Sequence, residues 1–205
     1  MLLQALSEHD MKKDTTTIAG TAILGSLVIV FDYSMKFSRL KIPFPWLPYL
    51  KFDFTGVPIV LSLLLFGLAP GATTSAVAFL AILTRSGDFV GASMKALAEL
   101  STILGMAFSY RWLKNTKKFG KALSLILGVT SRVLTMFFAN LIILPTYYQT
   151  PQVAVIAVSH LIAAFNVVQG TISILLGYFL YNVIINRTSP SATRKNEGFL
   201  KHHKN

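Results

Sequence analysis

Three amide side chains lie inside segments that are otherwise apolar enough to cross a membrane. The stretch LIAAFNVVQGTISILLGYFLY, residues 161–181, contains Asn166 and Gln169, and Asn140 lies in the preceding apolar segment. Positions three apart on a helix project from the same face, so Asn166 and Gln169 would point to one side. Amides in hydrocarbon either hydrogen-bond across helices or bind a polar ligand. Three of them on two consecutive segments favour a ligand pocket.

Four ionisable residues fall within or beside the apolar segments: Asp32, Asp53, Glu99 and Arg132. Such groups are costly in a membrane and rarely face lipid, so each needs a partner. Glu99 and Arg132 could neutralise each other across two helices, as a structural ion pair or beside a ligand. Asp53 precedes an apolar segment and could cap a helix or oppose its dipole. His160 has no partner at metal-ligand spacing, and we interpret it as interfacial.

The composition is that of an integral membrane protein. The 205 residues are 53% hydrophobic and 13% charged, with a mean hydropathy of +0.59, and the apolar residues form long blocks. The absence of cysteine excludes disulfides and thiol catalysis. The net charge of +11 lies mostly between the blocks, which fits orientation in a bilayer and argues against nucleic-acid binding. Phosphate-loop, H-E-x-x-H and G-x-S-x-G motifs are missing, so we predict no enzyme and no cofactor.

Six apolar blocks predict an all-α, compact bundle of six transmembrane helices. They cover residues 17–37, 54–68, 72–83, 94–113, 122–144 and 155–185. Pro70 and Gly71 are expected to break the chain after the second block, and Pro145 to end the fifth. The second and third blocks are too short to span about 30 Å of hydrocarbon alone, and such segments often line a cavity.

These blocks divide the chain into an N-terminal arm (1–13), a six-helix membrane domain (14–187) and a polar tail (188–205) that we expect to be disordered. The arm lacks the features of a cleaved signal peptide. If both ends are cytoplasmic, the arm, the loop between the fourth and fifth blocks, and the tail hold most of the basic residues, as the positive-inside rule requires. The basic residues on the opposite side are then an exception, and they are Lys36, Arg39, Lys41, Lys51, Arg85 and Lys95.

Small residues recur along the first apolar block. Ala22 and Ser26 are four apart, Thr21 and Gly25 repeat the spacing, and Ala19 lies one turn before Ala22. Small residues at this spacing permit close helix approach, within the protein or to a partner subunit. We predict that Ala19, Ala22 and Ser26 contact a partner helix.

Four motifs follow one another between residues 49 and 181. They read YLKFDFTGVPIVLSLLLFGLAPGA, ALAELSTILG, ANLIILPTYY and FNVVQG. Together they resemble the motifs of the substrate-binding (S) subunits of energy-coupling factor (ECF) vitamin transporters, specifically the riboflavin type. The resemblance implies a six-helix S-component fold in the plasma membrane, with a substrate pocket near the outer face and the first loop covering it.

The resemblance also implies partners and a binding site. The chain would capture riboflavin or a related planar heterocycle as a transported ligand, while a transmembrane coupling subunit and two ATP-binding subunits drive its release. The positions that match the family's binding motifs are Asp53, Phe54, Thr55, Pro58, Glu99, Asn140, Asn166 and Gln169. Aromatic side chains that suit the walls of such a pocket are Phe54, Phe137, Phe138, Tyr147 and Phe165.

Two departures from the family pattern bear on the substrate. Gln169 stands where the family has Lys, and Gly56 stands where it has a second Asp. Gln can still donate an amide hydrogen bond to a ring carbonyl, but without charge assistance, so an S subunit for a different vitamin stays open. Two other classes stay open as well. One is an ion-coupled secondary transporter that uses Asp32, Glu99 and Arg132, and the other is a structural membrane protein.

Overall fold

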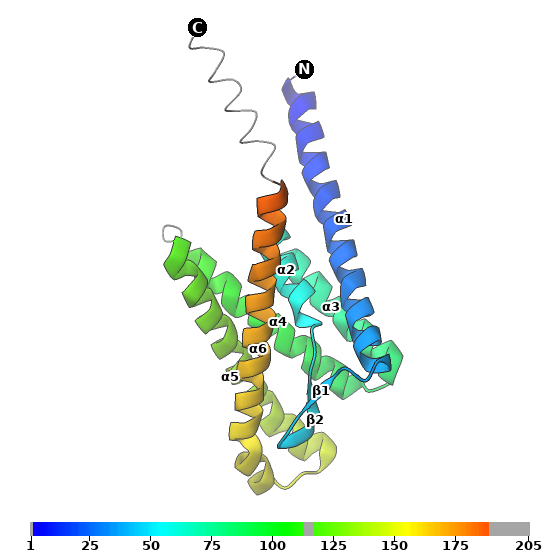
Figure 1. The fold of residues 1–205 in the computed structure, drawn as a ribbon, viewed down its shortest axis with the longest axis vertical. Coiled ribbons are helices and arrows are strands. Elements are labelled where there is room, and N and C mark those ends of the chain that lie inside the picture. The colour runs from blue at the N-terminus through cyan, green and yellow to red at the C-terminus, as the bar shows by residue number, and fades with distance from the viewer. Residues whose placement is uncertain (1, 113–116, 189–205) are drawn as a thin grey trace.

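The computed structural model describes the backbone of residues 2–112 and 117–188, with side chains over 14–109 and 120–187, as a bundle of helices and one hairpin (Figure 1). The predicted six-helix membrane bundle is confirmed. In chain order the described elements are α1 (Leu2–Phe37), β1 (Ile42–Phe44), β2 (Leu47–Phe52), α2 (Gly56–Phe66), α3 (Leu68–Ser86), α4 (Phe89–Trp112), α5 (Lys117–Tyr148) and α6 (Gln152–Thr188). Helix α1 runs on through the N-terminal arm, and its apolar part is Asp14–Phe37. The tail from residue 189 onward lies outside the described residues.

The break between α2 and α3 falls earlier than the sequence predicts. It lies at Gly67, whose φ of 101° is a conformation that favours glycine, and its N–H bonds the Leu63 carbonyl at 3.0 Å. Pro70 sits in the first turn of α3, where its missing N–H costs nothing. Helix α3 is therefore 19 residues long and apolar enough to cross a membrane. Helix α2 is also apolar, but with 11 residues it is too short to cross.

Helix α5 also differs from expectation at its C-terminal end. Pro145 was expected to end it, but the helix continues to Tyr148 with Pro145 inside. A proline so close to the end disturbs only the last turn. The chain then reverses at Gln149, and the N–H of Thr150 bonds the Leu144 carbonyl at 3.1 Å.

The loop after α1 folds into an antiparallel hairpin that the sequence did not predict. Strand pairing aligns Ile42 with Phe52 and Pro43 with Lys51. Prolines are tolerated because each strand of an isolated hairpin has an open edge. The prediction of an all-α bundle holds for the membrane-crossing part, and this hairpin is an addition to it.

The hairpin lies away from the start of α1 and the end of α6. In Figure 1 the start of α1 and the end of α6 lie towards one end of the molecule, as do the end of α4 and the start of α5, and β1 and β2 lie towards the other. Helix α2 packs against α1, α3 and α6, and α5 packs between α4 and α6. Residues 56–63 of α2 are all buried, so the shortest helix forms the centre of the bundle.

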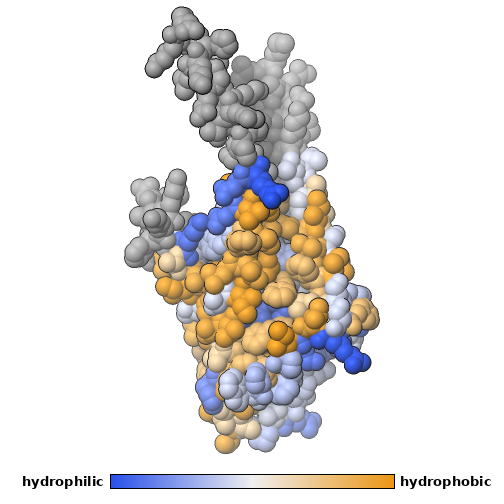
Figure 2. Space-filling view, viewed as in Figure 1, coloured by the Kyte–Doolittle hydropathy of each residue, from blue (hydrophilic) through white to orange (hydrophobic). Residues whose placement is uncertain are grey.

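The exterior is apolar and the interior contains charge. Figure 2 shows hydrophobic side chains over much of the visible helical surface. Exposed residues include Ile18 (69%), Ile142 (67%) and Phe179 (62%), while Asp32, Glu99 and Arg132 are buried. This distribution suits a bundle whose surroundings are lipid. Five of the described helices are long and apolar enough to span a membrane.

The small residues of α1 divide between two faces. Gly25 lies against Val77 of α3, and a Cβ at Gly20 would overlap the Phe66 ring of α2. These glycines therefore allow α1 to approach its neighbours within the chain. The predicted partner-contact residues Ala19, Ala22 and Ser26 are instead exposed on the outside.

Candidate functional site

Seven side chains of alternating charge form a continuous series through the bundle. At its first end, Asp32 of α1 accepts from Arg85 of α3 through Oδ2 at 2.5 Å and from Lys41 through Oδ1 at 2.6 Å. Lys41 precedes β1, and its Nζ also lies 3.9 Å from Oδ2 of Asp53, which follows β2. Both ends of the hairpin are thus held by ion pairs.

The series continues from Asp53 into the helices. Nζ of Lys95 lies 2.9 Å from Asp53 Oδ1 and 2.9 Å from Glu99 Oε1, and Nη1 of Arg132 lies 3.1 Å from the same Glu99 oxygen. The predicted pair of Glu99 and Arg132 is confirmed, with exposures of 0% and 1%. Neither Glu99 oxygen has a partner at proper hydrogen-bond angles among the described residues, so these contacts act through charge.

Sequence reasoning missed three members of this series. Lys41, Arg85 and Lys95 were counted only as basic residues on the side opposite the termini, without partners. The structure turns all three towards carboxylates of other elements. The one local signal was the spacing of Lys95 and Glu99, since residues four apart on a helix are neighbours.

The charges around Asp53 determine its protonation. Burial alone would raise the pKa of this carboxyl, but the ammonium groups of Lys95 and Lys41 outweigh it and lower the pKa to about 2. Oδ1 of Asp53 also accepts from the Thr55 N–H at 3.2 Å and from the Thr55 hydroxyl at 2.7 Å. Asp53 is therefore ionised throughout the neutral range and orders the turn that leads into α2.

This lowered pKa predicts a loss of stability in acid. Because the folded pKa lies below the ordinary value of 3.8, the stabilisation from Asp53 is complete above about pH 5 and is lost as pH falls towards 2. The melting temperature of the detergent-purified protein can be followed from pH 7 to 2.5. We expect Asp53 to contribute no pH dependence above about pH 5 and a fall below it. The variant Asp53→Asn should lose part of the acid dependence, and an unchanged acid profile in that variant would contradict the assignment.

Both ends of the Gln169 amide form hydrogen bonds with the backbone of Asp53. Its Nε2 donates to the Asp53 carbonyl at 2.8 Å, and its Oε1 accepts from the Asp53 N–H at 3.3 Å. Both residues are buried, at 0% and 6% exposure. The residue predicted as a substrate contact therefore fastens the end of the hairpin to α6.

The two departures from the family pattern lie on either side of Ser173. Gln169 Nε2 is 3.5 Å from Ser173 Oγ, and a Cβ added to Gly56 would lie 2.4 Å from the same oxygen. That Cβ would also lie 2.5 Å from Glu99 Oε2. An Asp at position 56 would bring a second carboxylate against Glu99, so the small neutral residue suits this environment.

The two asparagines occupy neighbouring helices on the hairpin side of the ion series. Asn166 accepts from Arg132 Nε at 3.1 Å and donates to the Ile162 carbonyl at 2.9 Å, and Asn140 donates to the Met136 carbonyl at 2.7 Å. Asn140 borders a small, partly open cavity between α5 and α6 that has no room even for a water molecule. The other residues that line it are Phe137, Leu141, Val155, Ser159 and Ile162.

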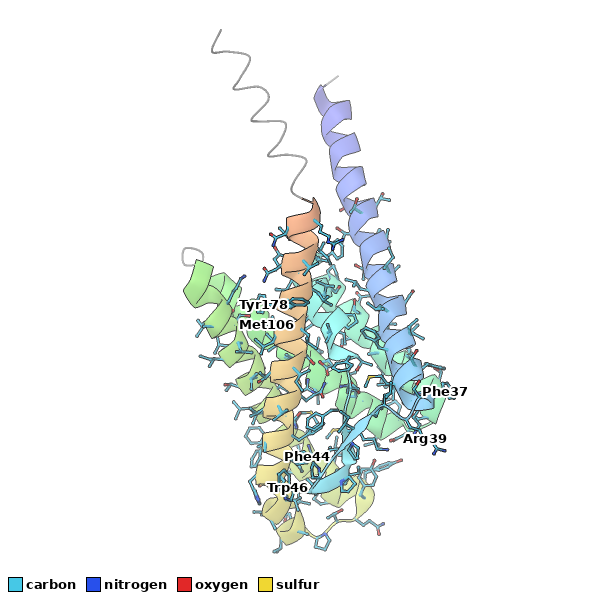
Figure 3. The ribbon with its side chains drawn as sticks, viewed as in Figure 1. Phe37, Arg39, Phe44, Trp46, Met106 and Tyr178 are labelled. Carbon is cyan, nitrogen blue, oxygen red and sulfur yellow. The ribbon has the colours of Figure 1, made fainter. Side chains whose placement is uncertain are left out.

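The hairpin covers this part of α6 with aromatic side chains. Phe44 and Leu47 are buried against Ile162 and Phe165, and the rings of Phe52 and Phe165 lie 4.8 Å apart. Figure 3 shows Phe44 and Trp46 near this end of the molecule, away from Met106 and Tyr178. The contacts at the tip are apolar, in contrast to the ion pairs at the hairpin base.

The other predicted residues are partly in the site and partly outside it. Thr55 and Pro58 are buried at the start of α2, and Phe54 is 43% exposed beside them. Phe137 lines the cavity beside Asn140, and Phe165 packs against the hairpin. Two aromatic residues expected in the pocket wall are on the outer surface instead, and these are Phe138 (60%) and Tyr147 (63%). The exposed His160 and its neighbours form no cluster of metal ligands in the described part of the chain.

Comparison with known proteins defines the class of this multi-pass membrane protein. Residues 16–186 match the family model "ECF transporter, substrate-specific component". The Bacillus subtilis (strain 168) protein "Riboflavin transporter FmnP" is 30% identical over 146 residues, which are 65% of this chain and 76% of that protein. The structure described as "Structure and mechanism of the S component of a bacterial ECF transporter" has the same fold, with a TM-score of 0.67 and 24% identity over 85% of this chain and 98% of that chain.

The chain belongs to the substrate-specific (S) components of ECF transporters. It is a non-enzymatic transport subunit, of a family that works with an energising module. This membership favours the transport-subunit interpretation over a self-sufficient secondary transporter or a purely structural membrane protein.

Proposed function

We propose that this chain captures riboflavin, or a closely related planar heterocycle, beneath the hairpin and delivers it for uptake. The observation that carries the proposal is the meeting of Asn140, Asn166 and the aromatic hairpin at one end of the bundle. A mostly apolar site with a few fixed polar groups suits a ring with hydrogen-bonding edges. The similarity to a riboflavin transporter supports the same substrate.

The cavity beside Asn140 has to open before a ligand can enter. Pockets that bind small molecules typically enclose about 300–1,000 Å³, whereas this cavity has no room even for a water molecule. Ile162 lines the cavity and also packs against Phe44 and Leu47, so we propose that the hairpin tip moves to open it. The contacts at the tip are apolar, so this movement would break no ion pair. The base, held through Lys41 and Asp53, then acts as the fixed end of a lid.

Asn166→Leu should weaken riboflavin binding by about 5-fold or more, because a fixed amide donor to the ligand is worth at least about 1 kcal/mol. Quenching of flavin fluorescence, titrated with the purified full chain, measures the affinity, which we expect to be submicromolar for the unmodified protein. Asn182→Leu is the matched control, since Asn182 is exposed towards the other end of the same helix and should bind riboflavin normally.

Two results would count against riboflavin capture. A flat riboflavin titration with folded, unmodified protein would remove riboflavin as the substrate, and a screen of other vitamins would follow. If Asn166→Leu lowered the melting temperature in proportion to the affinity, the amide would have only a structural role.

We infer that both termini are cytoplasmic and that the hairpin faces outward across the plasma membrane. Of the six basic residues assigned to the hairpin side, Lys41, Arg85 and Lys95 are neutralised by buried carboxylates. Only the exposed Lys36 and Arg39, together with Lys51, then count as loop charges there, so the apparent exception to the positive-inside rule largely disappears.

The energising partners are proposed to be a transmembrane coupling subunit and two ATP-binding subunits, with the coupling subunit meeting the exposed face of Ala19, Ala22 and Ser26. Ala22→Leu should then reduce co-purification with the coupling subunit several-fold while riboflavin binding stays normal, because a bulky side chain prevents close helix approach. Ala157→Leu, at an exposed alanine of α6, is the matched control. Equal loss of the complex in both variants would place the interface elsewhere.

A further inference from the structure

Arg132 is a buried guanidinium that joins three helices. It extends from α5, is 1% exposed, and contacts Glu99 and Thr102 of α4 through Nη1 at 3.1 and 3.2 Å. Its Nε donates to Oδ1 of Asn166 on α6 at 3.1 Å. Arginine is always charged in proteins and has donors only, so every group around it must offer an acceptor.

This contact determines which way the Asn166 amide points. The two ends of an amide are similar in shape, so their assignment must come from their hydrogen-bond partners. Arg132 can face only the carbonyl oxygen, and on the other side the Ile162 carbonyl can face only the NH₂ group, 2.9 Å away. Two partners of opposite kind therefore select one orientation.

The fixed orientation leaves Asn166 with an N–H group to offer. Its oxygen accepts from Arg132, which keeps a cation beside that oxygen, and one of its two N–H groups donates to Ile162. The second N–H therefore remains for another acceptor. Ile162, one turn earlier on α6, lines the cavity beside Asn140. Gln169, one turn later, has both ends of its amide bonded to the backbone of Asp53.

We propose that Arg132 is a positioning residue that makes Asn166 a hydrogen-bond donor, so this position of the site selects a ligand acceptor such as a ring carbonyl and rejects a ring amine. The ion series supports this role, because Glu99, which also pairs with Lys95, holds the guanidinium in place from α4. The inference rests on the proposed function, since it concerns the same site and a flavin-like ligand.

The test uses riboflavin and two analogues, each with one of the two carbonyls of its pyrimidine ring replaced by an amino group. The full-length, detergent-purified chain should prefer riboflavin over one of these analogues by at least about 10-fold, since facing donors cost more than a missing bond. Asn166→Asp keeps an acceptor for Arg132 but has no N–H, so it should reverse the preference between riboflavin and that analogue.

Two further variants separate positioning from mere stability. Arg132→Lys keeps the charge opposite Glu99 but loses the rigid planar donor, so it should lower the ratio of the two affinities several-fold. Gln169→Glu makes the same amide-to-carboxylate change at a side chain that is already bonded to the Asp53 backbone. It should lower the affinity for riboflavin and for the analogue by the same factor, so the preference should not reverse.

The outcomes are distinct. The inference is overturned if Asn166→Asp keeps the original preference, or if Arg132→Lys leaves the ratio of affinities unchanged. If Asn166→Asp does not fold, the Arg132→Lys ratio decides. If the unmodified chain binds neither riboflavin nor the analogues, the proposed function itself fails, and this inference fails with it.

Discussion

Replacing Glu99 with Gln is expected to lower the free energy of unfolding by about 3–5 kcal/mol, the range typical of removing one partner from a buried ion pair. Glu99 is the one carboxylate within ion-pair distance of both Lys95 and Arg132 in the described structure. Its neutralisation leaves Arg132 without an opposite charge and Lys95 with Asp53 alone. Reversible unfolding in mixed detergent micelles measures the change.

The position of Glu99 in the series also predicts an order of effects. Arg132→Met should cost less than Glu99→Gln, because Glu99 keeps Lys95 as a partner when the guanidinium is removed. The double variant should be more stable than the sum of the two single losses predicts, since charges that interact directly are not additive. Asp14→Asn, the same kind of change at an exposed carboxylate, is the control and should be nearly neutral. A cost for Asp14→Asn similar to that of Glu99→Gln would mean that the ion series contributes nothing specific.

Gln169→Leu is expected to have the second largest effect, about 2–4 kcal/mol of unfolding free energy, because it leaves the N–H and the carbonyl of Asp53 buried and unbonded. Faster hydrogen exchange at the Asp53 amide should accompany the loss if the hairpin base is released. Riboflavin affinity should fall as well, because the lid then loses its fixed end.

Gln169→Lys distinguishes the fastening role from direct ligand contact. Lys can donate to the Asp53 carbonyl but cannot accept from its N–H, which is then left buried without a partner. We expect lower stability and weaker riboflavin binding than in the unmodified protein. Tighter riboflavin binding at unchanged stability would instead show that position 169 contacts the ligand directly.

The local pattern of the sequence was enough to determine the number of apolar helices and the polar positions inside them, although it placed the break between α2 and α3 too late and made α3 too short to cross. Hydropathy over about 20 residues reports which segments partition into lipid, and an ionisable residue in such a segment must find a partner. The pairing of Glu99 with Arg132 follows from that requirement, because few opposite charges are available within the apolar blocks. The amides at 140, 166 and 169 stood out for the same reason.

Apart from the pair of Glu99 and Arg132, only the tertiary structure decided which partner each polar group has. Gln169 bonds a backbone 116 positions away, and Arg85 reaches Asp32 across 53 positions, distances at which no periodicity in the sequence carries information. The same holds for the hairpin, whose aromatic side chains find α6 rather than water, and for Phe138 and Tyr147, which face outward. Hydropathy indicates that a residue lies in the membrane. Whether its side chain points to lipid or to another helix, and which atom it bonds, depends on how the helices pack against one another.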